Sequence, residues 1–342
     1  MCLYPKIILN RKYLANKKNG GQVPPMPDER VKYVPIGCQN CIECRKQKAR
    51  EWQIRLLEDI KTHTNGKFIT LTFNNESIKE LNNEIEILEG YHRDNQIATL
   101  AMRRFLERWR KEYKKSIRHW MVTELGSNGT ENIHLHGIVW TDIDLKEVER
   151  IWKYGYVWKG KEEKGKIINY VNEKTVGYIT KYVHKMDVKH LTYKSIILTS
   201  PGIGHNYTNT HDSKKNYFNH KETIETYRTR TGHKISLPIY WRNKIFSDHQ
   251  REQLWLNRLD KQERWVRGER VDVSKGMNEY DKLLKWHQER NIELGYGTDK
   301  KDWSKEQYER ERRKLLTLQR IKNAEVKRLA GGAVNQKGSG LN

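Results

Sequence analysis

Residues 118–140, RHWMVTELGSNGTENIHLHGIVW, contain the two strands that decide the fold. The apolar residues of IHLHGIVW predict a buried strand, and neighbouring side chains on a strand point to opposite faces. His134 and His136 therefore share one face, while Leu135 points into the core. The upstream strand HWMVTEL ends near Glu124. The turn-forming residues 126–130 predict a hairpin that brings Glu124 beside both histidines.

These three side chains form a candidate metal site. Two imidazoles and one carboxylate, held on a rigid pair of strands, suit a divalent cation. The alternative is that His134 and His136 are ordinary strand residues and that Glu124 is solvated. Short motifs alone do not separate the two interpretations. The choice therefore depends on what the rest of the chain carries.

The composition points to nucleic acid as the partner. The chain has 342 residues, enough for one large or two modest domains, and a formal net charge of +23. A surface this basic attracts polyanions. The 11 Trp and 18 Tyr suit single-stranded nucleic acid, whose bases stack on aromatic rings, although they also serve as core in a chain with 5 Phe. No apolar run approaches membrane-spanning length and no signal peptide is evident, so we expect a soluble intracellular protein.

Four cysteines form a second candidate metal site. Cys38, Cys41 and Cys44 lie in two overlapping C-x-x-C steps, and Cys2 stands far upstream. Four thiolates can bind zinc tetrahedrally. The usual second C-x-x-C pair is missing, so reduced structural cysteines at the start of a helix remain the alternative.

Residues 167–185, IINYVNEKTVGYITKYVHK, are the second stretch that carries chemistry. The pattern predicts a helix on which Tyr178 and Tyr182, four residues apart, share one face. Lys181 and Lys185 repeat this spacing beside them. A tyrosine has a pKa near 10 and attacks a phosphodiester only if a metal polarises the phosphate. A tyrosine pair in a helix more often serves packing, but its combination with the candidate metal site favours catalysis.

At this point the sequence resembles the replication initiators of microviruses, small single-stranded DNA phages, and especially their gokushovirus-like group, within the HUH endonuclease superfamily. Three stretches carry the resemblance in order and spacing: FITLTF at 68–73, HLH at 134–136 and YITKYVHK at 178–185. The cysteine-rich opening, the basic segment KQKAREWQIR and SPGIG at 200–204 are similar as well. The resemblance covers most of residues 1–245.

The resemblance implies rolling-circle replication. Members of this superfamily nick one strand at an origin through a tyrosine, which becomes linked to the 5′-phosphate and leaves a free 3′-OH. It implies that Tyr178 and Tyr182 alternate as nucleophiles and that Lys181 contacts the scissile phosphate or supplies a proton. His134, His136 and, as the third ligand, Glu124 would hold Mg²⁺ or Mn²⁺. The partners would be single-stranded DNA, the replication origin and the host replication machinery, in the host bacterial cytoplasm.

We expect an α+β fold in which a central antiparallel sheet carries the histidines and helices pack on it. The segments would be a cysteine-rich basic N-terminal part with a helix, an HUH endonuclease core, and a charged helical C-terminal part: 1–62, 63–247 and 248–342. Residues 235–247 predict a buried strand and turn. The last residues, 331–342, predict a flexible tail.

Two other functions fit the same sequence. One is a non-catalytic, zinc-containing regulator that binds nucleic acid without cleaving it. The other is a relaxase or transposase of the same superfamily, with similar chemistry in another genetic role. A covalent protein–DNA adduct would exclude the first of these.

Overall fold

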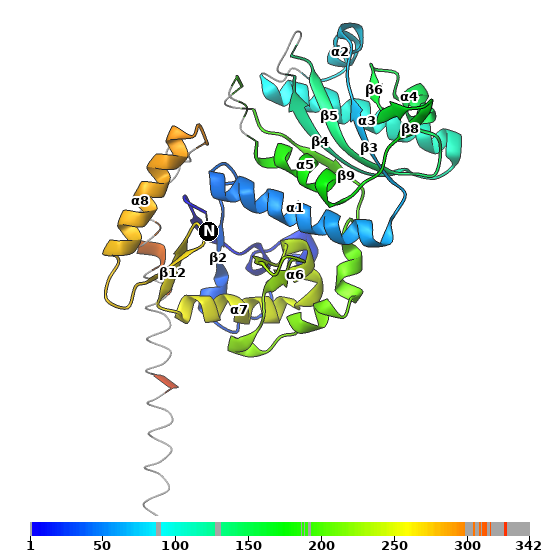
Figure 1. Ribbon diagram of the computed structural model, residues 1–342. Coiled ribbons are helices and arrows are strands. Elements are labelled where there is room, and N and C mark those ends of the chain that lie inside the picture. Colours follow the sequence, from blue (N-terminus) through cyan, green and yellow to red (C-terminus); the bar gives the residue numbers. More distant parts are fainter. Residues whose placement is uncertain are drawn as a thin grey trace, which may run out of the picture. The chain divides into compact units, whose positions relative to one another are not determined.

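Figure 1 shows the computed structural model of the protein, which consists of two compact units. Unit 1 comprises residues 1–44, 218–223 and 246–342, and unit 2 comprises residues 45–217 and 224–245. The residues that the structure describes are 2–86, 90–126, 131–185, 187, 189–190, 193–297, 304, 308, 310–312, 315 and 325–326. The predicted flexible tail at 331–342 and part of the predicted hairpin turn, 127–130, lie outside the described residues.

Unit 2 is built on a five-stranded sheet in the order β6-β3-β5-β4-β9, in which every neighbouring pair is antiparallel. Its strands are β3 (Gly66–Leu71), β4 (Arg118–Leu125), β5 (Ile133–Trp140), β6 (Val157–Trp158) and β9 (Ile197–Thr199). The predicted hairpin of β4 and β5 therefore lies at the heart of the sheet, and the predicted α+β architecture is confirmed.

Helices cover both faces of this sheet (Figure 1). On one face, Leu135 and its neighbours pack against α2 (Asn75–Asn82), α3 (Tyr91–Tyr113) and α4 (Leu145–Trp152). On the other face, Trp120 and Ile138 pack against α1 (Ile42–Thr62) and α5 (Glu173–His184). The alternation of strand side chains separates these two cores. The second face is the one that carries the histidines.

Two glycines permit close packing around this sheet. A Cβ on Gly137, directly after His136, would lie 2.0 Å from the carbonyl oxygen of Trp120 on β4. Gly204, in the SPGIG segment, has a φ of +71°, and its Cβ would lie 2.6 Å from the carbonyl oxygen of Arg55. The buried Asp59 fixes this contact, because its Oδ1 accepts a hydrogen bond from the Gly204 N–H over 2.8 Å. These positions require glycine because any side chain would collide with backbone.

Unit 1 combines short hairpins and helices from the two ends of the chain. Its elements are β1 (Lys6–Leu9), β2 (Tyr33–Ile36), α7 (Asp248–Asp260), β12 (Glu263–Val266), β13 (Glu269–Asp272) and α8 (Asn278–Glu293). Leu3 and Tyr4 pack against Val266 and Tyr280 in one shared core. These two compact units do not coincide with the three segments predicted from the sequence. The three segments describe functional parts, and their boundaries remain a prediction.

Two local predictions were wrong. Within the stretch predicted to be helical, β12 and β13 form an antiparallel hairpin closed by Arg267 and Gly268, both with positive φ. Residues 235–247 were predicted as strand and turn, but β11 (Lys234–Ser236) is followed by the helix α6 (Ile239–Ile245). Trp241 of α6 is fully buried, so burial in the tertiary fold decides this segment rather than its strand propensity.

The remaining elements are short. They are β7 (Lys161–Glu163), β8 (Lys166–Ile168), β10 (Thr226–Arg228) and 3₁₀ helices at Arg11–Tyr13, Lys17–Asn19, Glu29–Lys32, His205–Asn209, Asp212–Asn216 and His220–Glu222. Within the described part of the chain, no helix has the length and apolar character that crossing a membrane requires.

Candidate active site and cysteine cluster

The pairing of β3, β5 and β4 brings the predicted ligand residues together. Glu124 on β4 lies directly opposite His134, and His136 lies between Val122 on β4 and Thr70 on β3. Both histidines are half-buried while Leu135 between them is fully buried, so they share a face as predicted. The three candidate ligands therefore lie at one end of the sheet face that α1 and α5 cover.

His136 is held on both sides of its ring. The Oγ1 atom of Thr70 lies 3.0 Å from Nδ1 in a hydrogen bond, and Nε2 lies 2.9 Å from Oε2 of Glu124. Nε2 is buried and, among the described residues, has no partner with the alignment of a hydrogen bond. A hydrogen bond at one ring nitrogen fixes the orientation of the other, as is usual for metal-binding histidines. The Nε2 atom of His136 thus faces the Glu124 carboxylate.

The nitrogen and oxygen atoms of these three side chains are suited to a divalent cation. In the structure the three side chains do not point at one common position. The ring centroids of His134 and His136 are 6.3 Å apart. Burial, followed by the neighbouring His136, lowers the pKa of His134, which keeps that imidazole neutral. Burial opposes the charge of Glu124, but contacts with His136 and Lys185 outweigh it and lower its pKa. Neutral imidazoles and an ionised carboxylate are the protonation states that metal binding requires.

The two predicted tyrosines lie on α5 and differ in environment. Asn172 caps the helix, with its side chain accepting from the backbone N–H of Thr175. Tyr182 is 8% exposed and its ring stacks on His136, with centroids 4.6 Å apart and planes within 4°. Tyr178 is 43% exposed, and its oxygen accepts a hydrogen bond from the Tyr182 hydroxyl over 2.6 Å. Burial, helped by Tyr178, raises the pKa of Tyr182.

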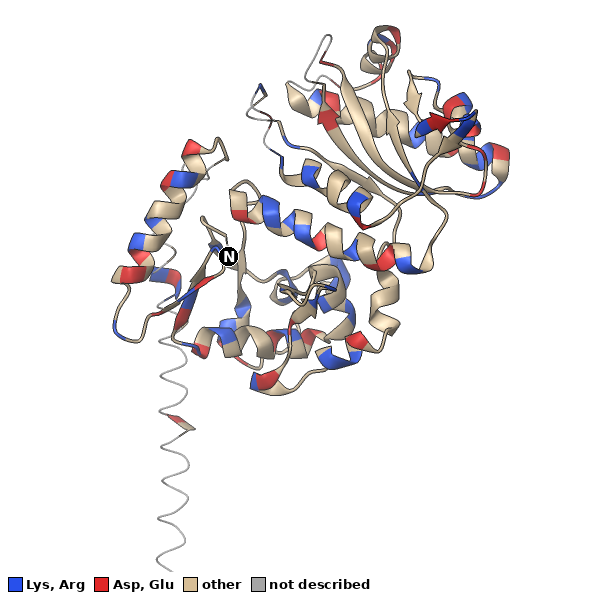
Figure 2. Cartoon of the chain, in the orientation of Figure 1, with Lys and Arg blue, Asp and Glu red and all other residues tan. Residues whose placement is uncertain are grey.

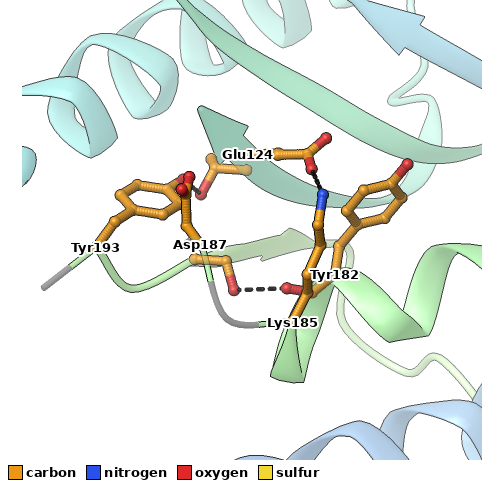
Figure 3. A pocket seen from close by; sticks show the side chains of 7 residues that line it. Glu124, Tyr182, Lys185, Asp187 and Tyr193 are labelled. Carbon is orange, nitrogen blue, oxygen red and sulfur yellow. Dashed lines mark hydrogen bonds and ion pairs between the residues drawn. The ribbon is translucent and has the colours of Figure 1, made fainter. Parts of the chain in front are cut away.

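The two lysines of α5 have different neighbours. The Nζ atom of Lys181 lies 4.1 Å from the centre of the Tyr178 ring, whereas that of Lys185 lies 2.5 Å from Oε1 of Glu124. Figure 3 shows the cavity beside this ion pair, which has a volume of about 20 Å³. Such a cavity holds roughly one water molecule. This cavity is therefore too small to hold a nucleotide.

The sequence prediction missed Thr70, which orients His136. The stretch FITLTF entered only as a motif of the resemblance, with no role for Thr70. The register Thr70–His136 joins strands 66 positions apart, which no local pattern reveals. The sequence did contain a signal, since Thr70 and Thr72 alternate with the fully buried Ile69 and Leu71 and so place polar side chains on the other face of the strand.

Residues 66–187 match a family of replication-associated proteins, described as the ORF2 type. The match spans β3, both histidines and both tyrosines, and its ends lie close to the first and last motifs of the resemblance. It is consistent with a microvirus-like replication initiator. No curated protein and no solved structure matches the chain.

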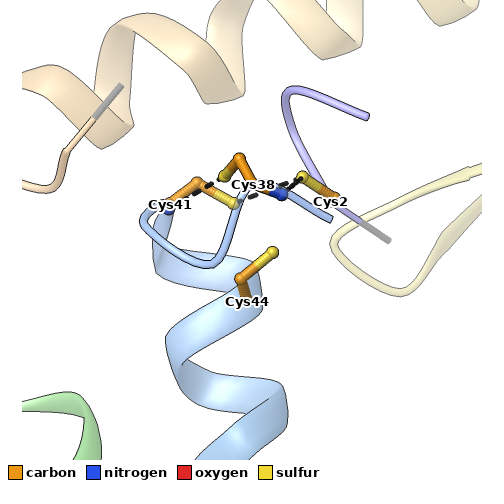
Figure 4. Close-up of side chains that lie close together, drawn as sticks. All are labelled: Cys2, Cys38, Cys41 and Cys44. Carbon is orange, nitrogen blue, oxygen red and sulfur yellow. Dashed lines mark hydrogen bonds between the residues drawn. The ribbon is translucent and has the colours of Figure 1, made fainter. Parts of the chain in front are cut away.

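Outside the matched segment, four cysteines gather in unit 1 (Figure 4). Their sulfur atoms all lie within 4.8 Å of one another, and they are the one set of three or more potential ligands this close within the described residues. Sγ of Cys2 and Sγ of Cys41 are 3.9 Å apart, and none of the four forms a disulfide. The cluster could therefore bind a structural metal such as zinc.

The four thiols of the cluster have divided pKa shifts, since hydrogen bonds among them raise the pKa of Cys2 and contacts within the cluster raise that of Cys44. N–H groups of Tyr4 and Cys38 donate to Sγ of Cys2 over 3.3 and 3.2 Å. Contact with Cys2 lowers the pKa of Cys38 to about 7 and also lowers that of Cys41. A Cβ at Gly37 would lie 3.0 Å from Sγ of Cys44, so a side chain at this position would press against that sulfur atom. Cys2, which the C-x-x-C spacing alone did not fix, is brought in by the packing of the N-terminus.

Proposed function

We propose that this protein initiates rolling-circle replication by nicking and rejoining single-stranded DNA at a replication origin. The match of residues 66–187 supports the role of a replication initiator. One geometric observation supports the chemistry: two tyrosine hydroxyls lie 2.6 Å apart beside the ring of His136. An exposed nucleophile, a second one within reach and a candidate metal site next to both are the parts that a two-step strand transfer needs.

In the proposed first step, Oη of Tyr178 attacks the scissile phosphorus and the bond to the 3′ oxygen breaks. Tyr178 loses its hydroxyl proton and the leaving 3′ oxygen gains one, so the protons balance. The products are a 5′-phosphotyrosine link and a free 3′-OH. The ammonium of Lys181, beside the Tyr178 ring, is the candidate group for holding the phosphate or supplying the proton.

Tyr178 is the better first nucleophile because it is exposed and accepts a hydrogen bond. A hydrogen bond donated by Tyr182 stabilises the negative charge that forms on the attacking oxygen of Tyr178. Tyr182, buried and with a raised pKa, is held back for the second step. There its oxygen attacks the regenerated junction, and the 3′-OH at the end of the displaced strand then attacks the Tyr178 link to close the circle.

His134, His136 and Glu124 would hold Mg²⁺ or Mn²⁺ in this proposal. When bound, such an ion polarises the phosphate oxygens and stabilises the charge on the leaving oxygen. Thr70 and Lys185 act on this site indirectly, Thr70 by orienting His136 and Lys185 by neutralising Glu124 until the site is occupied. The four cysteines would hold zinc as a structural ion that joins the N-terminus to the start of α1.

The distribution of charge supports DNA as the partner. Figure 2 shows Lys and Arg along α1 and α5, the two helices that cover the catalytic face. Burial lowers the pKa of His184 on α5, and the nearby cations Lys46 and Arg50 of α1 lower it further, so the two helices bring positive charge together. We propose single-stranded origin DNA as substrate, host replication proteins as partners and the cytoplasm of a bacterial host as the location.

Incubation with single-stranded DNA from the protein's own genome tests this function. With Mg²⁺ or Mn²⁺, the proposal requires a protein–DNA adduct that survives denaturation, together with a product bearing a free 3′-OH. The Tyr178→Phe/Tyr182→Phe double variant is the matched control and must form no adduct. Binding without any adduct would instead indicate a non-catalytic regulator.

A further inference from the structure

The open edge of the catalytic sheet carries two aromatic side chains that the proposed chemistry does not use. Strand β6 is the edge strand, and Trp158 pairs with Thr70, the residue that orients His136. Tyr156 precedes this strand and is 62% exposed. Neither residue belongs to the candidate metal site or to the nucleophile helix.

Trp158 lies on the catalytic face, where its ring contacts Phe68, and the exposed Tyr156 stands two residues before it at the same edge. Val157, between them, is fully buried in the core on the opposite face, and neighbouring residues alternate along a strand. The backbone oxygen of Tyr156 accepts hydrogen bonds from N and Oγ1 of Thr72, over 3.0 and 2.9 Å. A Cβ on Gly155 would lie 2.6 Å from the oxygen of Thr72, so only glycine allows this close approach.

A continuous row of rings connects this edge to the nucleophile. Trp158 contacts Phe68 with ring centroids 5.2 Å apart, and Phe68 contacts Tyr178 edge-on at 5.8 Å. The 43% exposed Tyr178 thus stands at one end of a row whose other end is the half-buried Trp158, two residues from the exposed Tyr156. Phe68 packs against the core, so the row holds its two end rings, Trp158 and Tyr178, in fixed positions on this face.

We propose that Tyr156 and Trp158 form a base-stacking site that holds single-stranded DNA beside the scissile phosphate at Tyr178. This inference rests on the proposed function. It adds that the two aromatic side chains recognise the bases of the DNA substrate. The net charge of +23 supplies affinity for the phosphates, whereas exposed rings supply stacking, which accepts any base. The two aromatic residues are positioning residues and take no part in bond making.

The test compares two probes without added divalent ion: an oligothymidylate of about 16 nucleotides and an abasic strand of the same length. The wild-type protein should bind the oligothymidylate more tightly. Tyr156→Ala should lower this preference by about 5- to 150-fold, the effect of one stacked base, and leave abasic binding unchanged. Tyr156→Phe keeps the ring and should behave like the wild type.

Tyr217→Ala is the matched control, because Tyr217 is 63% exposed and belongs to the same unit. It should retain the full preference for bases. Trp158→Phe, which keeps an aromatic ring against Phe68, should retain most of it, and thermal unfolding of each variant checks the fold. An unchanged preference in Tyr156→Ala would overturn the stacking site while leaving the proposed function intact. A wild-type protein that bound neither probe would refute both.

Discussion

Replacing each tyrosine of α5 separately should have unequal effects on the first nick. Tyr178→Phe removes the exposed hydroxyl, so Tyr182 must take over. To do so, the Tyr182 ring must leave its stack on His136 and its buried position. Tyr182→Phe leaves the first nucleophile in place and removes only the hydrogen bond that it donates to Tyr178.

The two costs follow from these contacts. Leaving the stack costs about 0.5–1.5 kcal/mol, and re-exposing a large buried side chain costs about 1.5–3 kcal/mol. Together they raise the activation free energy by about 2–4.5 kcal/mol, so the Tyr178→Phe variant should nick roughly 30- to 2000-fold more slowly than the wild type. The lost hydrogen bond in Tyr182→Phe is worth about 1 kcal/mol, which slows the first nick roughly 5-fold.

Single-turnover nicking of end-labelled single-stranded origin DNA measures both rates. A second assay with a substrate that carries two origins measures the release of circles, which we expect to fail in both variants because each retains one nucleophile. Equal nicking rates for the two variants, or a slower rate for Tyr182→Phe, would refute the assigned order. Unfolding midpoints within a few degrees of the wild type show that the comparison concerns chemistry.

Four further outcomes are expected. His136→Ala should remove several kcal/mol of transition-state stabilisation and so slow cleavage, which a cleavage assay measures. Its binding of single-stranded DNA, measured by gel shift, should change little. Gly137→Ala should lower the free energy of unfolding by about 3 kcal/mol, because its Cβ collides with the backbone of β4, and denaturant titration checks this. Purified protein should contain zinc that Cys41→Ser and acidification release, since thiolates must be deprotonated to bind; metal analysis that finds none without chelator treatment contradicts this. Binding should weaken steeply with salt, and Lys181→Ala should reduce the slope of the logarithmic plot by about 0.7 if Lys181 contacts one phosphate.

The parts of the site that depend on residues two or four positions apart could be predicted from the sequence. The two-residue alternation of a strand put His134 and His136 on one face, and helical spacing put Tyr178 and Tyr182 on another. Both arrangements depend only on neighbouring residues, and both recur in the structure. The pairing of Glu124 with His134 required only a hairpin between adjacent strands.

What the sequence could not reveal depends on contacts between distant segments. Thr70 meets His136 only because β3 pairs with β5, and the N-terminus shares a core with α8 only because the chain ends meet in unit 1. The β12–β13 hairpin was hidden because charged residues dominate this stretch, a composition that is also typical of a solvated helix. Its turn, Arg267–Gly268, has the positive φ values of a tight hairpin but lacks the common Asn-Gly or Asp-Gly sequence.

Mass spectrometry of the covalent adduct tests the central claim most directly. Wild-type protein would be reacted with single-stranded origin DNA, digested with nuclease and protease, and searched for a peptide that carries a nucleotide. The account predicts a 5′-phosphate link on Tyr178 after the first turnover, with Tyr182 labelled only when a second origin junction is supplied. A link on any residue other than these two, or nicking that proceeds without any protein-linked nucleotide, would contradict it.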